Sequence, residues 1–510
     1  MSLRYQICVK LSALFLAVSV FSNLSGQDSI QRSDSTNNHA KEQSQIATQT
    51  ALDHRPPNVL MICIDDLNDW TGYLGGHPQA RTPNLDRLAK TGRAFTNAHC
   101  AVPVCSASRI SVFSGLHATT HGSYELGPSY TSIKRLDTAP TLHATFKQNG
   151  YQTLTGGKVL HHGFKGRLEK DIDTILYPRH GGPRPKEAMH WNPRVWDYGP
   201  FPETDDQMDD MKLAQAAATF LQQPSEQPFF MTVGFFRPHV PMYVPPRWFE
   251  MFDRKTLVLP DASPDDMLDI PDNFKNMNQI APDHQTVVQS GQWPGFVQAY
   301  LASTAFVDHC VGTVLAGLST GPHMDHTLIV LWSDHGFHLG EKQHWAKRTL
   351  WEESTRIPLI FAGKRIRASG SCEEPASLVD LYPTLIEYCE LKTQTKLDGI
   401  SLVPQLNDLS ATRAQPVRIS SFEGNHAIRS KHWRYIRYRD GSEELYDHRS
   451  DAKEHKNLSG NPDLKSIQDR LASYLPTEAA AEVKPIKSRE ANDENLRQRR
   501  KDSGPIGPSP

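Results

Sequence analysis

Two apolar runs in this sequence end in side chains that can bind a cation. The run at 58–64 is followed by Asp65 and Asp66, and a second run, LIVLW, leads through a serine to Asp334 and His335. Parallel strands would bring these four side chains to one edge of a sheet, where the carboxylates repel one another unless a cation or raised pKa values relieve them. Oxygen ligands of this kind suit calcium or magnesium. A strand-end Asp that only caps the next segment is the alternative, and the recurrence of the pattern favours a metal site.

The segment CSASRISVFSG, which begins at Cys105, combines a thiol with a positive environment. Ile110 and Phe113 predict a packed helix that begins close to Cys105. A residue at a helix N-terminus faces unpaired backbone N–H groups and the positive end of the helix dipole, and Arg109 lies one turn further along the same face. These groups would bind an anionic substrate. The alternatives for Cys105 are an ordinary buried thiol, half of a disulfide, or a cysteine nucleophile.

This segment resembles the signature of the type I, formylglycine-dependent sulfatase family, Cys-x-Pro/Ala-Ser-Arg followed by Leu-Thr-Gly. Ala107 stands where proline is commoner, and Phe-Ser-Gly replaces Leu-Thr-Gly. In that family the cysteine is oxidised to formylglycine (3-oxoalanine) before folding is complete. The resemblance therefore implies that Cys105 is the precursor of a catalytic aldehyde, and that a formylglycine-generating maturation enzyme acts on the chain.

Three further elements match the family in the same order along the chain. In GGKVLHHG, Lys158 would contact sulfate and His161 would hold the formylglycine hydroxyl. FRPHVP places His239 at the family's second active-site histidine, and HWAK places Lys347 at its late lysine. A lysine alone is normally a solvated charge, and a histidine alone is often an ordinary polar group. Their order along the chain favours the functional interpretation.

Within the family, three features resemble iduronate 2-sulfatase: GKVLHHG, FRPHVP and the Asp334-His335 pair. The resemblance implies hydrolysis of a sulfate ester of a sulfated carbohydrate, with one Ca²⁺ per chain. The residues that it assigns to the metal are Asp65, Asp66, Cys105 as formylglycine, Asp334 and His335. The residues that it assigns to catalysis are Cys105, Arg109, Lys158, His161, His239 and Lys347.

Two other functions remain open at this level. A metallohydrolase of the same superfamily acting on phosphate or phosphonate esters would share the metal-bearing sheet. A non-catalytic protein that binds sulfated glycans would share the fold, although every catalytic position is filled in this chain.

The elements that must position these residues alternate along the chain. Apolar runs without alternation predict strands buried on both faces, at 58–64, 229–235, 328–332 and 358–361. Helical patterns occur between and after them, at 82–92, 141–148, 206–221, 296–318 and 376–388. The alternation predicts an α/β fold with a large mixed, mostly parallel sheet flanked by helices, which the resemblance implies to be alkaline-phosphatase-like. Active sites in such sheets lie beyond the carboxyl ends of the strands.

The ends of the chain differ in composition from its centre. Arg4 and Lys10 flank the start of an apolar run at 11–21 that is typical of a signal peptide and too short to span a bilayer comfortably; an uncleaved anchor is the alternative. Alternating aromatic and charged residues around Asp440-Gly441 predict a hairpin in a small antiparallel α+β subdomain. The predicted parts are a signal peptide (1–26), a disordered linker (27–56), a catalytic domain (57–405), a C-terminal subdomain (406–476) and a disordered tail (477–510).

Composition limits the possible partners and location. The formal net charge of -2, from 55 basic and 57 acidic residues, argues against a generally basic nucleic-acid binder. We expect an exported protein, periplasmic or secreted, without stable membrane association after signal cleavage. Removing Cys8 with the signal peptide leaves six of the seven cysteines, an even number that permits disulfides.

Overall fold

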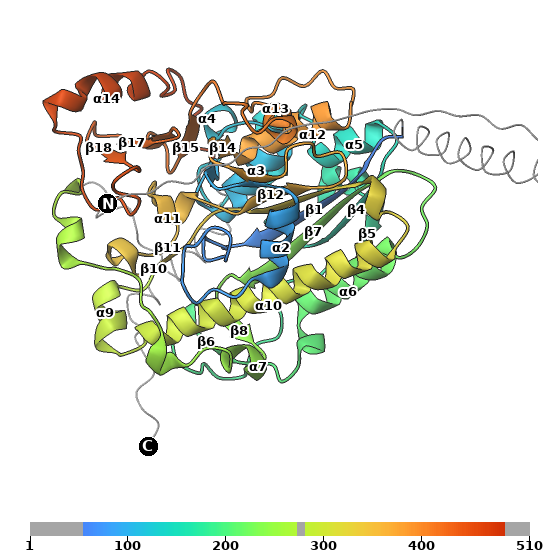
Figure 1. Cartoon of the computed structure of the whole chain (residues 1–510), viewed down its shortest axis with the longest axis horizontal. Coiled ribbons are helices and arrows are strands. Elements are labelled where there is room, and N and C mark those ends of the chain that lie inside the picture. The colour runs from blue at the N-terminus through green and yellow to red at the C-terminus, as the bar shows by residue number, and fades with distance from the viewer. Residues whose placement is uncertain (1–54, 273–280, 485–510) are drawn as a thin grey trace, which may run out of the picture. The chain divides into compact units, whose positions relative to one another are not determined.

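A computed structural model describes residues 55–272 and 281–484 of the chain. The predicted signal peptide, most of the linker and the last part of the tail lie outside these ranges. The described residues form an eight-stranded central sheet and a four-stranded C-terminal sheet, with helices around the central one (Figure 1).

The central sheet is mixed and mostly parallel, as predicted. Its strand order is β13-β2-β12-β9-β1-β7-β4-β5, and β12 runs antiparallel to both of its neighbours while the other pairs are parallel. The strands are β1 (Asn58–Asp65), β2 (Arg93–Phe95), β4 (Gln152–Gly157), β5 (Thr174–Ile175), β7 (Phe229–Pro238), β9 (Thr327–Ser333), β12 (Leu359–Ala362) and β13 (Gly370–Cys372).

Helices cover both faces of this sheet, which explains why its central strands are apolar without alternation. Leu60, Ile62 and Ile64 of β1 belong to a core that includes side chains of α2, α6 and α10, whereas Val59 and Met61 belong to a core with α3, α5 and α12. Figure 1 shows α6 and α10 on one side of the sheet and α3, α5 and α12 on the other. These helices are α2 (Pro83–Thr91), α3 (Cys105–Ser114), α5 (Leu142–Gln148), α6 (Asp209–Leu221), α10 (Trp293–Thr320) and α12 (Leu381–Tyr388).

Helix α10 is long and apolar enough to cross a membrane by length and composition alone, and it is the one such helix among the described residues. However, 72% of its most apolar window is buried, and it packs against the sheet and α6. We therefore interpret α10 as a core helix.

The helix predicted at 376–388 begins later than expected. Residues Ala376–Ser377 form the short strand β14, and a 3-10 turn follows before α12 begins at Leu381. The Ser377 hydroxyl accepts from a backbone N–H within this turn, and the Asp380 carboxylate accepts from the backbone N–H of Ser377. These two reciprocal bonds form a capping box, which fixes where the helical segment begins.

Short elements complete the catalytic part of the chain. The helices are α4 (Ala118–His121), α7 (Pro246–Phe249), α9 (His284–Gln289), α11 (Glu352–Thr355) and α13 (Val403–Asn407). The strands are β3 (Ala98–His99), β6 (Tyr198–Pro200), β8 (Met242–Val244), β10 (His338–Leu339) and β11 (Trp345–Ala346).

The C-terminal region contains the predicted antiparallel hairpin. It joins β17 to β18 within a sheet of order β15-β16-β17-β18, and α14 follows. The elements are β15 (Val417–Ser420), β16 (His426–Arg429), β17 (Trp433–Arg437), β18 (Glu443–Asp447) and α14 (Lys465–Ala472).

A buried ion-pair network joins this sheet to α11. The Arg434 guanidinium, fully buried, pairs with Glu352 of α11 and with Glu454, and the Arg429 Nε lies 3.2 Å from Glu352. His448 Nε2 lies 2.8 Å from Glu454. The carboxylates are therefore already neutralised by protein cations, although their spacing would also admit a metal ion.

Replacing Arg434 with alanine should lower the free energy of unfolding by about 3–5 kcal/mol, because Glu352 and Glu454 would remain buried without this partner. Chemical denaturation measures the change. The matched control is Lys431→Ala, which removes a partly exposed pair with Glu374 and should cost about 0–1 kcal/mol. Equal effects of the two substitutions would contradict the prediction.

Residues 477–484, which the sequence assigned to the disordered tail, make backbone hydrogen bonds to the segment around α4. The Ala480 N–H donates to the Thr119 carbonyl and the Val483 N–H donates to the Gly122 carbonyl. The Tyr124 hydroxyl donates to the Ala480 carbonyl. These backbone bonds hold a segment that has no apolar pattern of its own.

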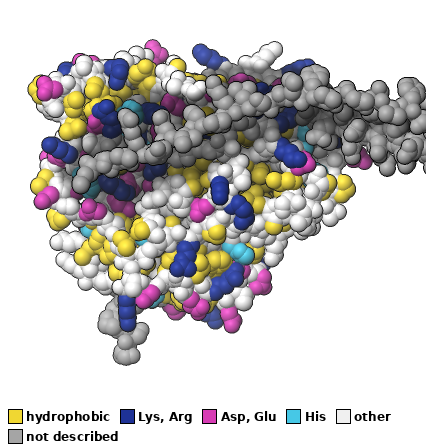
Figure 2. Space-filling model, viewed as in Figure 1, with side chains coloured by type: hydrophobic (Ala, Val, Ile, Leu, Met, Phe, Trp, Pro, Cys, Tyr) yellow, Lys and Arg dark blue, Asp and Glu magenta, His cyan; other side chains and the backbone are white. Residues whose placement is uncertain are grey.

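Two further sequence expectations concern thiols and charge. All six cysteines within the described ranges are free, so no disulfide is formed there. On the face shown in Figure 2, basic and acidic side chains are interspersed rather than gathered by sign, in keeping with the small net charge.

Candidate active site

The carboxyl ends of β1 and β9 meet because the strands pair in parallel, with Ile64 opposite Ser333. The structure thereby brings Asp65 and Asp66 beside Asp334 and His335. The Asp66 N–H donates to Asp334 Oδ1 at 3.1 Å, and His335 Nε2 lies 3.3 Å from Asp66 Oδ1. All four side chains are fully buried.

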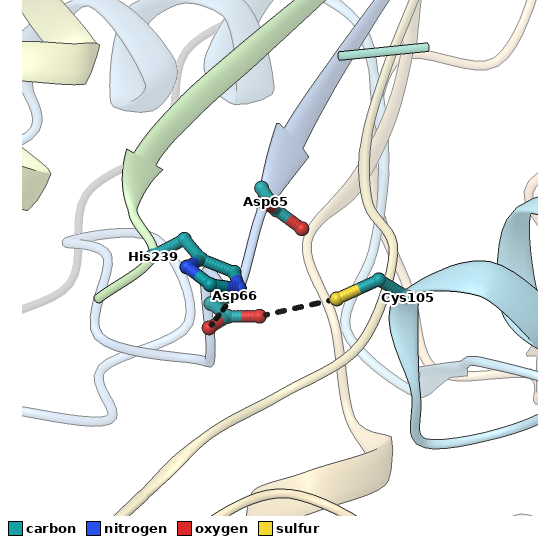
Figure 3. Close-up of side chains that lie close together, drawn as sticks. All are labelled: Asp65, Asp66, Cys105 and His239. Carbon is teal, nitrogen blue, oxygen red and sulfur yellow. Dashed lines mark hydrogen bonds and ion pairs between the residues drawn. The ribbon is translucent and has the colours of Figure 1, made fainter. Parts of the chain in front are cut away.

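Cys105 is the first residue of α3, and its side chain points from the helix end toward Asp66, with His239 beyond that carboxylate (Figure 3). The Cys105 Sγ lies 3.8 Å from Asp66 Oδ1, 3.1 Å from His335 Nε2 and 2.9 Å from Lys347 Nζ. The helix places its open N-terminal N–H groups at the same point. The cysteine therefore lies at the centre of the carboxylate cluster.

Three buried cations pair with the three carboxylates. Arg109 Nε lies 2.8 Å from Asp334 Oδ2, and its Nη2 lies 3.3 Å from Asp65 Oδ1. Lys158 pairs with Asp65. The Lys347 Nζ lies 2.5 Å from Asp66 Oδ1. A tetrahedral anion that entered the cluster would find charged donors from three separate elements.

Burial acts differently on the three carboxylates. It raises the pKa of Asp66, and Lys347 offsets this only in part. Burial also raises the pKa of Asp334, and the nearby Arg109 charge lowers it only in part. For Asp65, the cations, led by Lys158, outweigh burial and hold the pKa well below its usual range. Two of the three carboxylates thus carry a charge that the protein groups alone do not fully stabilise.

Asp66 has the features of a metal ligand. Its Oδ2 is buried and has no hydrogen-bond partner among the described residues. Its backbone is left-handed, with φ of 64°, a conformation that costs energy for a residue other than glycine. The Tyr300 hydroxyl donates to the Asp66 carbonyl at 2.7 Å and accepts from the Asn68 N–H at 2.8 Å, which holds this turn in place.

Replacing Tyr300 with phenylalanine should weaken calcium binding by roughly 10–100-fold, the usual cost of losing a group that orients a metal ligand. Calcium titration by calorimetry measures this directly. Tyr382→Phe is the control, because that buried hydroxyl bonds to Thr145 on α5 instead. If both variants bind calcium as tightly as the unmodified protein, Tyr300 does not position Asp66.

The two predicted catalytic histidines lie differently. His239 follows β7, with its Nδ1 2.5 Å from the Val240 carbonyl and its Nε2 3.8 Å from Asp66 Oδ2. His161 makes no hydrogen bond to the cluster within the described ranges, and its buried Nδ1 has no partner. Burial lowers the pKa of both rings, and the nearby Lys158 charge lowers it further.

Three residues outside the predicted set, Ser108, Cys63 and Tyr300, support the site. The Ser108 hydroxyl donates to the Asp334 carbonyl at 2.6 Å, and the Arg109 Nη1 lies 3.4 Å from Cys63 Sγ. Tyr300 is 234 residues from Asp66 in the chain. Of these residues, only Cys63 could have been found from the sequence, because it lies in the apolar run of β1 that leads directly to Asp65.

A family model described as Sulfatase matches residues 57–390. The chain belongs to the sulfatase family. A second model, described as N-sulphoglucosamine sulphohydrolase, C-terminal, matches residues 340–481 of this sulfatase. Its fold and its sequence are therefore those of an enzyme that hydrolyses sulfate esters, as the residues around Cys105 implied.

Known proteins extend this similarity over most of the sulfatase chain. A sulfatase of Formosa agariphila is 35% identical over 441 residues, covering 82% of this chain and 86% of the relative. Human iduronate 2-sulfatase is 27% identical, covering 79% and 76%. The crystal structure of a phosphonate monoester hydrolase of Agrobacterium radiobacter superposes with a TM-score of 0.66 at 19% identity, covering 89% of this chain and all of that one. At that identity the last match concerns the fold alone.

Proposed function

We propose that this sulfatase removes sulfate from a sulfated carbohydrate, using a formylglycine formed from Cys105 and one bound Ca²⁺. The observation that carries the proposal is the position of Cys105, whose Sγ contacts both Lys347 and His335 at the head of α3. A thiol with these neighbours has no evident structural purpose. Burial raises its pKa, so an unmodified Cys105 would be a poor thiolate nucleophile.

The side chains present fit a calcium ion. Among the described residues, no hydrogen bond reaches the buried Asp66 Oδ2, and the donor set is rich in carboxylate oxygens, which calcium prefers. Asp65, Asp66, Asp334, His335 and residue 105 would hold the ion. The formylglycine would supply an aldehyde hydrate, and the bound Ca²⁺ would make a hydroxyl of that hydrate more acidic.

The protein cations have separate tasks in this proposal. Lys158 and Lys347 bind sulfate oxygens, which gain charge in the transition state. Arg109 bridges Asp65 and Asp334 and so fixes the metal-binding carboxylates. His161, whose Nδ1 is free of protein partners, orients the hydrate together with Arg109.

His239 supplies the proton that the departing alcohol needs. Because its Nδ1 faces the Val240 carbonyl, the proton is delivered from Nε2, with Lys347 as a neighbouring donor. Burial and Lys158 lower the pKa of His239. A bound sulfate monoester is negatively charged and acts in the opposite direction, favouring the protonated ring when substrate is present.

The class of substrate rests on sequence likeness. The similarity to iduronate 2-sulfatase supports a sulfated sugar, and the signal-like segment at 1–26 supports export to the periplasm or the medium. A formylglycine-generating enzyme is the required maturation partner in this proposal. Nucleic acid and a stable membrane attachment have no part in it.

The test is hydrolysis of 4-nitrophenyl sulfate and 4-nitrophenyl phosphate by protein expressed with a formylglycine-generating enzyme. Intact mass spectrometry of the same sample gives the fraction of chains with formylglycine at position 105. We expect sulfate turnover in proportion to that fraction and much slower phosphate turnover. Fast phosphate hydrolysis, or no sulfate hydrolysis by fully modified protein, would overturn the proposal in favour of a phosphohydrolase or a glycan-binding protein.

Calcium affinity should increase with pH between about pH 5 and pH 8. The raised pKa values of Asp66 and Asp334 mean that protons compete with the metal at the lower end of this range. The stability of the metal-free protein should change in the opposite direction, because its free energy of unfolding falls as pH rises through those raised pKa values. Unfolding temperature measured with and without calcium across the range tests both trends, and a pH-independent calcium effect contradicts them.

A further inference from the structure

The loop between β5 and β6 is anchored beside the active site by its backbone. The Gly182 N–H donates to Asp209 Oδ2 at 3.1 Å, and Arg237 Nη2 donates to the Gly181 carbonyl at 3.1 Å. Gly181 and Gly182 have φ values of 97° and 69°, which other residues rarely adopt. These contacts tie the loop to α6 and to the end of β7.

The anchored turn places the His180 ring over Phe236. Their centroids lie 5.7 Å apart with an interplanar angle of 16°. The same Phe236 ring lies 4.7 Å from the His239 ring and 5.0 Å from Lys158 Nζ. One aromatic side chain therefore separates His180 from two residues that the proposed function uses.

His180 and Arg184 are exposed, and neither makes a hydrogen bond or ion pair with another described residue. Arg179 of the same loop differs, because its Nε and Nη2 lie 3.2 Å from the Tyr177 hydroxyl. Arg184 also lies close to the buried Arg237. Desolvation lowers the pKa of Arg237 to about 10, with the Arg184 charge acting in the same direction.

The charge along the loop is mostly positive. Residues 179–194 include four Arg and Lys residues and two His residues against one acidic residue, Glu187. The Arg237 guanidinium is occupied by the Tyr243, His239 and Gly181 carbonyls. Lys158 is paired with Asp65. Arg184 is thus a further cation that the cleaved sulfate does not require.

We propose that His180 and Arg184 form a subsite for a second anionic group of the sugar, a carboxylate or another sulfate, beside the sulfate that is removed. This inference rests on the proposed function and narrows its substrate class. A guanidinium binds such a group through charge-assisted, often bidentate hydrogen bonds. The His180 ring, held over Phe236, contributes ring nitrogens that can hydrogen-bond to the same group. A neutral sugar would shield Arg184 from water without pairing it, which is unfavourable.

The experiment compares four substrates with formylglycine-containing enzyme. These are a 2-O-sulfated uronic acid, a disulfated hexosamine, a neutral monosulfated hexose and 4-nitrophenyl sulfate. We expect the formylglycine-containing enzyme without substitutions to favour at least one of the two sugars with a second anion over the neutral hexose. The sugar with the larger preference identifies the second group as carboxylate or sulfate. Equal kcat/KM for all three sugars would overturn the inference.

The variants Arg184→Ala and His180→Ala test the residues themselves. Arg184→Ala should lower kcat/KM for the favoured sugar about 10–100-fold more than for 4-nitrophenyl sulfate, mainly through KM. Arg184→Glu should lower it further, and Arg184→Lys should recover part of the loss. Lys90→Ala, which removes an exposed cation from the end of α2, is the control and should leave this ratio unchanged.

Two results separate this inference from the function on which it depends. If modified enzyme hydrolyses none of the four sulfate esters, the proposed function fails. If it hydrolyses them, while Arg184→Ala and Arg184→Glu lower the rates for sugar and aryl sulfate by the same factor or not at all, only the subsite is wrong. Unfolding temperatures of the variants should match the unmodified protein, because the replaced side chains are exposed.

Discussion

Cys105→Ala protein should lose sulfatase activity, with kcat/KM reduced by about 10⁴-fold or more. No neighbouring group can replace the side chain at this position, because Asp66, His335 and Lys347 already pair with one another around it. Cys105→Ser should be equally inactive in a host that does not oxidise serine. A serine hydroxyl would occupy the site without forming the aldehyde.

Cys310→Ala is the matched control for this result. Cys310 is a buried thiol on α10, in the core on the other side of the sheet from α3. Its loss should reduce stability slightly and leave turnover per modified chain unchanged. Full turnover by a Cys105→Ala protein whose mass has been verified would refute the assignment of position 105.

Asp66→Asn should abolish both calcium-induced stabilisation and activity. Calcium at roughly 100 times its Kd should stabilise the unmodified protein by about 3 kcal/mol, and the variant should gain nothing. Without calcium, the substitution should not lower stability. Because burial raises the pKa of Asp66, removing its charge should leave the metal-free protein as stable at neutral pH or more so. A variant that is merely misfolded would be less stable under both conditions.

Thermal unfolding with and without calcium, followed by an activity assay, separates these outcomes. Asp325→Asn is the control, since Asp325 is exposed and pairs with Lys364 on the surface. It should behave like the unmodified protein in every assay. If Asp66→Asn retains the full calcium response, the ion does not bind at the ends of β1 and β9.

Local patterns predicted the parts of the fold in which one segment carries its own signal. The unbroken apolar run of β1 requires cover on both faces, and helices provide it. The Asp65-Asp66 pair directly follows that run, so the strand itself places the acidic residues at the sheet edge. The segment from Cys105 to Arg109 likewise holds its chemistry within one helical turn.

Other features depend on contacts between distant segments, and no local pattern shows them. Tyr300 looks like one more aromatic residue of an apolar helix until the fold brings its hydroxyl to Asp66. The position of His180 depends on two hydrogen bonds of the adjacent glycines: Gly182 donates to Asp209, and Gly181 accepts from Arg237. The order of residues 477–484 could not be predicted from an apolar pattern. These residues are held mainly by backbone hydrogen bonds, which any sequence can make.

Under the proposed function, the burial of Cys105 limits when its thiol can be oxidised. All ten residues of α3 are buried and Cys105 has no exposed surface, so an oxidising enzyme can reach the thiol only while the chain is still open. β9, the partner that completes this side of the sheet, is synthesised more than 200 residues after Cys105, a delay of roughly 10–50 s at ordinary translation rates. Under the proposed function, a chain that folds with Cys105 still a thiol would be inactive, so the yield of working enzyme would be set during synthesis.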